Sequence, residues 1–142
     1  MPLQSSLDQT YIKMAQQWAQ LSKANRKKVG CLIVKDGSII SDGYNGTPSG
    51  FDNQCEDVDY FNQMVTREEV LHAESNAITK LAKSTQSSSG STMYITASPC
   101  VDCAKLIIQS DIARVVYGEF YKNNFGIELL KKAGIIVEHC EL

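Results

Sequence analysis

The stretch "MYITASPCVDCAKLIIQS", residues 93–110, decides the fold class of this chain. Residues 93–97 are apolar and β-rich and predict a strand, whereas residues 99–110 have the apolar spacing of a helix. Pro99 suits the first turn of that helix, because the N–H group it lacks would have no partner there. A strand that runs directly into a helix is the repeating unit of an α/β protein with parallel strands.

Further elements are predicted on both sides of this unit. Helices are expected over residues 7–23, 71–83, 99–110 and 126–134, and strands over residues 29–34, 38–42, 93–97, 114–117 and 135–138. Asp36-Gly37 is a two-residue hairpin turn, and Gly134 is a helix stop signal. We expect one domain, residues 1–142. Its predicted fold is a three-layer α/β/α arrangement whose five-stranded mixed sheet begins with a β-hairpin and continues with parallel strands. Residues 57–66 give no clear pattern.

Composition and charge narrow the class of protein. The chain has 142 residues, 43% hydrophobic and 21% charged, with a net charge of -2. These values are typical of a soluble globular domain, and the slightly acidic balance disfavours a polynucleotide as the main partner. No apolar run approaches the roughly 20 residues of a membrane span, and the first residues do not resemble a secretory signal. We therefore expect a cytoplasmic protein without a membrane or nucleic-acid partner.

The two cysteines of "SPCVDC", Cys100 and Cys103, are either a redox couple or two ligands of a metal site. A redox pair is expected after the first strand of a thioredoxin-like unit, but this pair follows the third predicted strand. The motif "HAE", residues 72–74, opens the preceding predicted helix and offers a further ligand. If both helices begin at the same end of the sheet, His72, Cys100 and Cys103 converge. Three protein ligands leave the fourth position of a zinc ion open for water, as in catalytic sites.

Glu74 lies two residues after His72 and can reach a water molecule at such a zinc ion without being a ligand itself. A His-x-Glu motif followed by Pro-Cys-x-x-Cys is the pattern of zinc-dependent deaminases, in which the glutamate transfers protons. Two other interpretations remain open. Glu74 is alternatively a solvated surface residue, and the zinc is alternatively structural, with Cys55, His139 or Cys140 as its fourth ligand.

With these motifs, the chain resembles the cytidine and deoxycytidylate deaminase superfamily, and more narrowly its deoxycytidylate deaminases. The resemblance covers nearly the full chain and includes "SK" at 22–23, "VGCLIV" at 29–34, "GYNGTPSG" at 43–50, "HAESNAI" at 72–78 and "SPCVDCAKLIIQS" at 98–110. It implies a cytidine-deaminase-like fold. It also implies hydrolysis of dCMP to dUMP and ammonia, which supplies thymidylate synthesis, with one Zn²⁺ per chain.

The resemblance also implies roles for individual residues. His72, Cys100 and Cys103 would bind zinc, and Glu74 would be the proton shuttle. Substrate contacts are expected from Asn45 to the sugar, from Ser22 and Lys23 to the phosphate, and from Tyr121 at the base pocket. The cations of "SKANRKK", residues 22–28, can instead complement a helix dipole, and an aromatic residue at position 121 can instead belong to the core.

Members of this family are typically homohexamers that are activated by dCTP and inhibited by dTTP. For this chain the resemblance places those effectors, with Mg²⁺ accompanying the triphosphate, at the glycine-rich loop, with Gly43, Tyr44, Gly46 and Gly50 as contacts. Glycines let backbone N–H groups approach phosphate oxygens closely. The same glycines can instead serve only the turn geometry of a loop after a hairpin.

Two further functional alternatives remain on sequence grounds. One is a deaminase that acts on a polynucleotide such as tRNA, or on another cytosine nucleotide. The other is a zinc-binding module without catalytic activity. Some relatives also carry a second, structural zinc before the HAE motif. No histidine occurs here between positions 56 and 71, and Cys55 is the nearest cysteine, so a second zinc is not expected.

Overall fold

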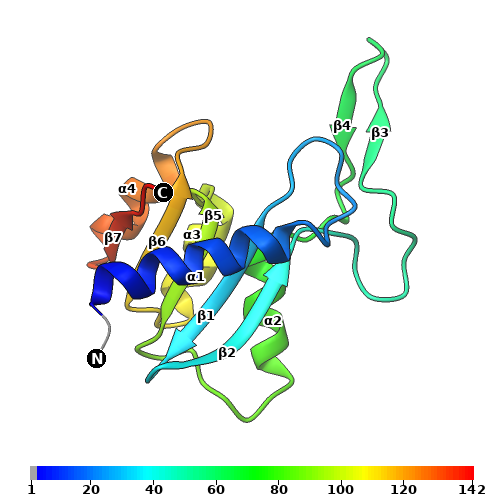
Figure 1. The fold of residues 1–142 in the computed structure, drawn as a ribbon. Coiled ribbons are helices and arrows are strands. Elements are labelled where there is room, and N and C mark those ends of the chain that lie inside the picture. The colour runs from blue at the N-terminus through cyan, green and yellow to red at the C-terminus, as the bar shows by residue number, and fades with distance from the viewer. Residues whose placement is uncertain (1–2) are drawn as a thin grey trace.

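The computed structural model describes residues 3–142, which form four helices, a five-stranded sheet and a separate two-stranded hairpin (Figure 1). The helices are α1 (Gln4–Ala19), α2 (Ala73–Ala82), α3 (Val101–Gln109) and α4 (Phe125–Lys132). The strands are β1 (Gly30–Lys35), β2 (Ser38–Tyr44), β3 (Glu56–Val58), β4 (Met64–Thr66), β5 (Thr92–Ala97), β6 (Arg114–Glu119) and β7 (Ile136–His139). None of the four helices is long and apolar enough to cross a membrane.

The main sheet has the strand order β2-β1-β5-β6-β7. Strand β1 is antiparallel to both β2 and β5, and the pairs β5–β6 and β6–β7 are parallel. The predicted mixed sheet, with a hairpin first and parallel strands after it, is confirmed. Because β1 runs against both of its neighbours, β2 and β5 run in the same direction. The helices that follow them, α2 and α3, therefore begin at the same edge of the sheet.

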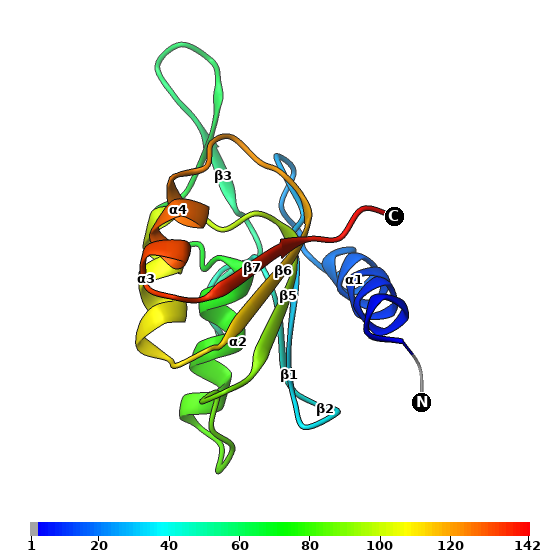
Figure 2. The same ribbon diagram turned by 90° about the vertical axis from the view of Figure 1, so that its left-hand side faces the viewer.

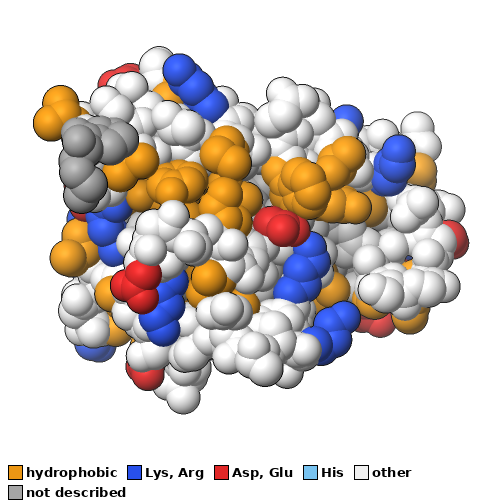
Figure 3. Space-filling view, turned by 60° about the horizontal axis from the view of Figure 1, so that its bottom comes forward, with side chains coloured by type: hydrophobic (Ala, Val, Ile, Leu, Met, Phe, Trp, Pro, Cys, Tyr) orange, Lys and Arg blue, Asp and Glu red, His pale blue; other side chains and the backbone are white. Residues whose placement is uncertain are grey.

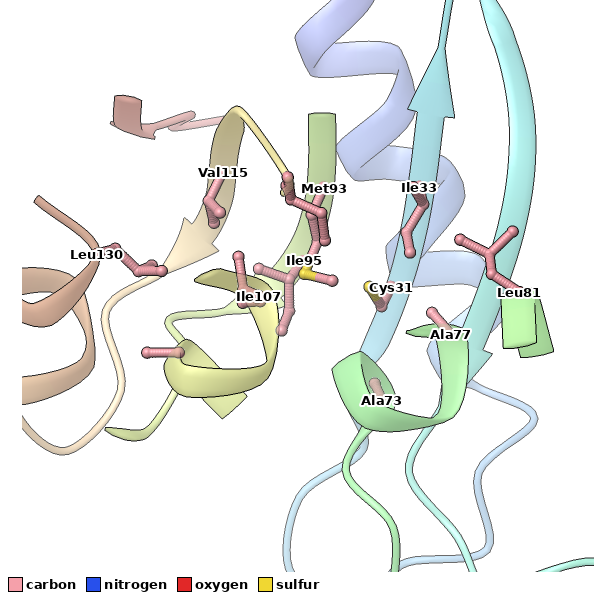
Figure 4. Close-up of a cluster of buried hydrophobic side chains, with 12 residues drawn as sticks. Cys31, Ile33, Ala73, Ala77, Leu81, Met93, Ile95, Ile107, Val115 and Leu130 are labelled. Atoms are coloured by element: carbon pink, nitrogen blue, oxygen red, sulfur yellow. The ribbon is translucent and has the colours of Figure 1, made fainter. Parts of the chain in front are cut away.

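Helices cover both faces of this sheet, as predicted. Figure 2 shows α1 on one side and α2, α3 and α4 on the other. The larger core lies under α2, α3 and α4, and its side chains converge between the helices and the sheet (Figure 4). Its fully buried members from strands and helices include Ile33, Met93, Ile95, Val115, Ile107 and Leu130. The strands β1, β5 and β6 are apolar on both faces because both faces are covered.

A buried ion pair fixes α1 to the opposite face. Arg114 of β6 donates to both carboxylate oxygens of Asp8, at 3.1 and 2.6 Å, and the hydroxyl of Tyr94 donates to the same carboxylate at 2.6 Å. Burial alone would raise the pKa of Asp8, but hydrogen bonds from Arg114, Tyr94 and Gln4 hold it below its usual value. Asp8 therefore stays ionised at neutral pH and keeps α1 in register with the sheet.

The region that gave no clear sequence pattern forms the β3–β4 hairpin, which projects away from the main sheet (Figure 1). Each strand has three residues, which is too short for a periodic signal. The side chain of Asp59 accepts the N–H groups of Phe61 and Gln63, both at 2.9 Å, and so orders the tip. Tyr60 and Phe61 are exposed at this tip and lie edge to face.

Gly43 allows β2 to lie directly against the backbone of α2. A Cβ atom at this position would lie 2.5 Å from the carbonyl oxygen of Ala73 and 2.8 Å from the backbone nitrogen of Ala77. The sequence analysis placed Gly43 among the effector contacts of a loop. In the structure it belongs to strand β2, and its missing side chain serves the packing of α2.

We predict that Gly43→Ala lowers the free energy of unfolding by about 2–3 kcal/mol, because the added methyl group forces α2 away from β2. Urea unfolding measures the change. Gly46→Ala is the matched control, since a Cβ atom there meets nothing within 4 Å and should leave stability nearly unchanged. Equal stability of the Gly43→Ala variant and the unaltered protein would contradict this account of the close approach.

Candidate active site

Three potential metal ligands converge where α2 and α3 begin. The Nδ1 atom of His72 lies 3.1 Å from the sulfur of Cys103 and 3.5 Å from that of Cys100, and the three atoms all lie within 4.8 Å of one another. His72 is the residue before α2, Cys100 is the residue before α3, and Cys103 is in the first turn of α3. The convergence predicted from the sequence is therefore present.

The geometry and the chemistry of this set fit zinc. Around a tetrahedral zinc ion, with bonds of about 2.3 Å to sulfur and 2.0 Å to nitrogen, ligand atoms lie roughly 3.5 Å apart. Thiolate and imidazole are also the ligands that zinc prefers. Among residues 3–142 no further His, Cys, Asp or Glu joins the cluster, so Cys55, His139 and Cys140 do not complete a closed four-ligand site. The open, three-ligand arrangement is that of catalytic zinc.

The two thiols differ in their protonation. Hydrogen bonds with the Cys103 thiol and with His72 lower the pKa of Cys100 to about 4. The hydrogen bond to Cys100, together with burial, raises the pKa of Cys103 well above its usual value. The hydrogen bond with Cys100 also raises the pKa of His72. Cys100 is thus a thiolate at neutral pH, and its charge lies at the N-terminus of a helix, where an anion is favoured.

Glu74 lies in the first turn of α2 with only 4% of its surface exposed. Burial raises its pKa to about 7. With His72 and Cys100 it lines a cavity of about 200 Å³. The alternative that Glu74 is a solvated surface residue is therefore wrong.

Segments far apart in the sequence line the same cavity. The lining side chains that matter for binding are those of Arg26, Lys27, Asn45, Glu56, Thr66, Tyr121 and Lys122. Asn45 and Tyr121 were expected at a substrate pocket and do line it. The sequence analysis also noted the basic segment 22–28 but favoured Ser22 and Lys23 within it.

Ser22 and Lys23 lie elsewhere. Ser22 is buried, donates from Oγ to the backbone oxygen of Asn45 at 2.7 Å and accepts the N–H group of Ala24 at 3.2 Å. Lys23 lines a different hollow. The cations of the segment that reach the cavity are Arg26 and Lys27. Because the segment is neither helix nor strand, it has no periodicity from which the sequence could identify them.

Lys27 and Tyr121 form one wall of the cavity. Lys27 is ion-paired with Glu119, and its Nζ lies 5.0 Å from the centre of the Tyr121 ring. Lys122 approaches the same ring at 5.4 Å. The N–H group of Tyr121 donates to the Oγ atom of Ser98 at 2.8 Å, which fixes the aromatic residue to the loop that carries Cys100. Two ammonium groups therefore lie near one aromatic ring in the lining of the cavity.

Asn45 connects the glycine-rich loop to the basic segment. Its Oδ1 atom accepts the N–H group of Val29 at 2.9 Å, and its Nδ2 atom donates to the backbone oxygen of Lys27 at 2.7 Å. Both polar atoms of the side chain are thus hydrogen-bonded to the main chain. It holds in place the residues that lead from Lys27 into β1.

A second hollow, of about 700 Å³, lies behind the glycine-rich loop. Of the four residues predicted to contact effectors, Tyr44, Gly46 and Gly50 line this hollow and Gly43 does not. Its lining also includes the cations Lys23, Lys80 and Lys83. Asn45 and Cys55 line both this hollow and the cavity with the metal ligands, so the two share a wall.

Comparisons with known proteins agree with this site. The family model for the cytidine and deoxycytidylate deaminase zinc-binding region matches residues 5–119. The deoxycytidylate deaminase of Enterobacteria phage T4 is 36% identical over 168 aligned positions, covering 90% of this chain and 86% of that enzyme. The deoxycytidylate deaminase of Saccharomyces cerevisiae is 33% identical, covering 95% of this chain and 45% of that enzyme. The crystal structure of dCMP deaminase from the cyanophage S-TIM5 in complex with dCMP and dUMP matches with a TM-score of 0.89 and 42% identity, covering 97% of this chain and 99% of that one.

We predict that the purified protein contains one zinc ion per chain and that Cys103→Ser abolishes stoichiometric binding, because the variant loses a thiolate from a three-ligand set. Elemental analysis after dialysis against metal-free buffer measures the content. Cys140→Ser is the control, since Cys140 is not part of the cluster, and it should retain its zinc. Full zinc content in the Cys103→Ser protein would refute the assigned ligand.

Proposed function

The chain belongs to the cytidine and deoxycytidylate deaminase family, and we propose that it catalyses the hydrolytic deamination of dCMP to dUMP and ammonia. The observation that carries this proposal is the convergence of His72, Cys100 and Cys103 beside the buried carboxylate of Glu74. The similarity to enzymes named deoxycytidylate deaminase, and to the S-TIM5 enzyme crystallised with dCMP and dUMP, supports the choice of substrate.

In the proposed reaction the oxygen of a water molecule bonds to C4 of the cytosine ring, and the bond from C4 to the amino nitrogen breaks. Zinc, if held by His72, Cys100 and Cys103, would lower the pKa of water at its open position to about 7. Glu74 would accept one proton from the attacking water and deliver it to the ring nitrogen N3. It would then accept the proton of the new C4 hydroxyl and deliver it to the leaving amine. The products are a C4 carbonyl and ammonia, so all atoms are accounted for.

A mononucleotide is the substrate that suits the cavity. Arg26 and Lys122 supply positive charge to its lining, beside Lys27, which is paired with Glu119, and a phosphate ester is a group that such cations bind. The net charge of -2 over the chain disfavours a polynucleotide as the substrate. The likeness to a tRNA adenosine deaminase, at 22% identity, concerns the fold alone.

We propose that the second hollow binds the nucleoside triphosphate effectors dCTP and dTTP. Lys23 and Lys83, together with Lys80, which is paired with Asp42, can neutralise a triphosphate with its Mg²⁺, and Gly50 leaves space beside the main chain for phosphate oxygens. The shared wall formed by Asn45 and Cys55 gives an effector a direct contact with the substrate cavity. Support for this regulation comes from these residues and from the family resemblance.

We also propose that the chain forms a homo-oligomer, with a hexamer as the expected state. Large hydrophobic side chains are exposed on α1 and at its two ends (Met14, Leu3, Leu21) and at the β3–β4 hairpin (Tyr60, Phe61). Hydrophobic side chains also gather in a band across the face shown in Figure 3. Exposed apolar surface that is gathered in this way is typical of interaction surfaces. Light scattering in solution measures the assembly directly.

The proposed activity predicts that dCMP is deaminated in preference to deoxycytidine, dCTP and a tRNA stem-loop, with ammonia release as the common measurement. Glu74→Gln should retain zinc and fold but lose at least about a hundredfold in kcat, because the proton transfer is removed. Glu128→Gln, an exposed residue of α4, should keep full activity. Substantial turnover by the Glu74→Gln protein would exclude the shuttle role, and faster turnover of the stem-loop would favour the polynucleotide alternative.

The proposed regulation predicts a sigmoidal response to dCMP that becomes hyperbolic when dCTP is added and is suppressed by dTTP. Lys83→Ala should weaken the response to dCTP several-fold, because one cation of the second hollow is lost. Lys131→Ala, on the exposed side of α4, should respond as the unaltered protein does. Hyperbolic kinetics that are insensitive to both triphosphates would argue against an effector site.

A further inference from the structure

Among residues 3–142 three carboxylates are buried: Asp8, Glu56 and Glu74. Asp8 is paired with Arg114, and Glu74 belongs to the candidate active site. Glu56 forms no salt bridge with any described residue, although only 7% of its surface is exposed. A buried carboxylate without a cationic partner is costly, so its hydrogen bonds must compensate for the lost hydration.

Glu56 obtains those hydrogen bonds from the irregular segment between α1 and β1. Its Oε2 atom accepts the N–H group of Asn25 at 2.8 Å and that of Arg26 at 3.0 Å. Its Oε1 atom accepts from the Asn25 side chain at 3.4 Å. Two successive backbone donors therefore point at one carboxylate oxygen, which fixes the main chain at the position from which the Arg26 side chain starts.

The guanidinium of Arg26 is held by the strand opposite Glu56. Thr66 of β4 is the register partner of Glu56 in β3, and its Oγ1 atom accepts from Nη1 of Arg26 at 3.1 Å. The cross-strand pair of Glu56 and Thr66 thus holds both the backbone and the guanidinium of Arg26. Arg26, Glu56 and Thr66 all line the cavity that contains the metal ligands.

Arg26 differs in this respect from Lys27, the other cation of the segment in the cavity. Lys27 is neutralised by Glu119, whereas Arg26 forms no salt bridge with any residue that the structure describes. A guanidinium has five N–H donors and binds phosphate in a planar, bidentate manner. Lys122, the third cation of this lining, also forms no salt bridge with a described residue, but its side chain makes no hydrogen bond with any of them. Arg26 is therefore the unpaired cation of this lining whose head group is held by a hydrogen bond.

From this geometry we infer that Glu56 and Thr66 are positioning residues, which hold Arg26 where it binds the phosphate group of the nucleotide substrate. The β3–β4 hairpin is then a specificity element that distinguishes a nucleotide from a nucleoside. This inference rests on the proposed deamination of dCMP and identifies the part of the site that recognises its phosphate. Neither residue touches the reacting base in this account.

The test compares kcat/KM for dCMP with kcat/KM for deoxycytidine, which lacks the phosphate. Glu56→Gln keeps the size of the side chain but removes its negative charge and leaves one accepting oxygen instead of two. The two backbone N–H groups then meet a weaker acceptor or compete with the Asn25 side chain for it. We expect kcat/KM for dCMP to fall about tenfold, mainly through KM, and that for deoxycytidine to change far less. Glu68→Gln, the same substitution at an exposed neighbour of the hairpin, should leave both values unchanged.

A double-variant comparison separates positioning from general structural support. In an Arg26→Ala background the dCMP preference is already reduced, so adding Glu56→Gln should cause no further loss. Thr66→Val, which removes only the hydroxyl acceptor, should lower the dCMP value by a smaller factor in the same direction. If the Glu56→Gln protein does not fold with its zinc, the result for Thr66→Val tests the positioning role instead.

Several results would overturn the inference. They are an equal loss on both substrates, an unchanged preference in both Glu56→Gln and Thr66→Val, or a full additional loss from Glu56→Gln when Arg26 is already alanine. If the unaltered protein prefers dCMP and the variants do not alter that preference, the positioning role alone is wrong. If the unaltered protein shows no preference for dCMP over deoxycytidine, the proposed substrate is wrong and this inference fails with it.

Discussion

The meeting of two helix N-termini at one edge of the sheet is the constraint on which the rest of the structure depends. Strands β2 and β5 run in the same direction because β1 lies antiparallel between them, and α2 and α3 therefore begin side by side. His72 and Cys100 precede these helices, and neither helix start has a side-chain cap. The free backbone N–H groups at the helix starts favour thiolates, and the charge of these thiolates favours a bound cation at the same point.

Close packing behind this point supports it. Gly43 lets β2 contact the backbone of α2, and the core of Figure 4 fills the space between α2, α3 and the sheet. On the other face Asp8 and Arg114 hold α1 against the strands. A displacement of α2 would move His72 and Glu74 together, so the geometry of the site depends on apolar packing that makes no contact with a ligand.

Polar side chains hold the loops in place through hydrogen bonds to the main chain, as apolar packing holds the helices. Asn45 and Glu56 each bind backbone groups of the irregular segment 22–29. Ser22, within the segment, accepts the N–H group of Ala24 and donates to the backbone oxygen of Asn45. A segment without regular structure has unpaired donors and acceptors, and when it is partly buried these must be satisfied by side chains. These hydrogen bonds order the segment, whose side chains Arg26 and Lys27 line the same cavity as His72 and Cys100. Asn45 connects this segment to the second hollow, and Glu56 connects it to the β3–β4 hairpin.

The sequence by itself determined the α/β class, the strand order of hairpin then parallel strands, and the cluster of His72, Glu74, Cys100 and Cys103, because hydrophobic periodicity and motif spacing are local signals. It did not reveal the β3–β4 hairpin, whose strands are too short for periodicity, nor the role of Gly43, which follows from a contact with a helix 30 residues away in the chain. It also favoured Ser22 and Lys23 over Arg26 and Lys27 within the basic segment. Which cation reaches the cavity was decided only by the tertiary structure, since it depends on a hydrogen bond that Asn45 donates to Lys27 and on one that Glu56 accepts from Arg26, and both bring distant parts of the chain together.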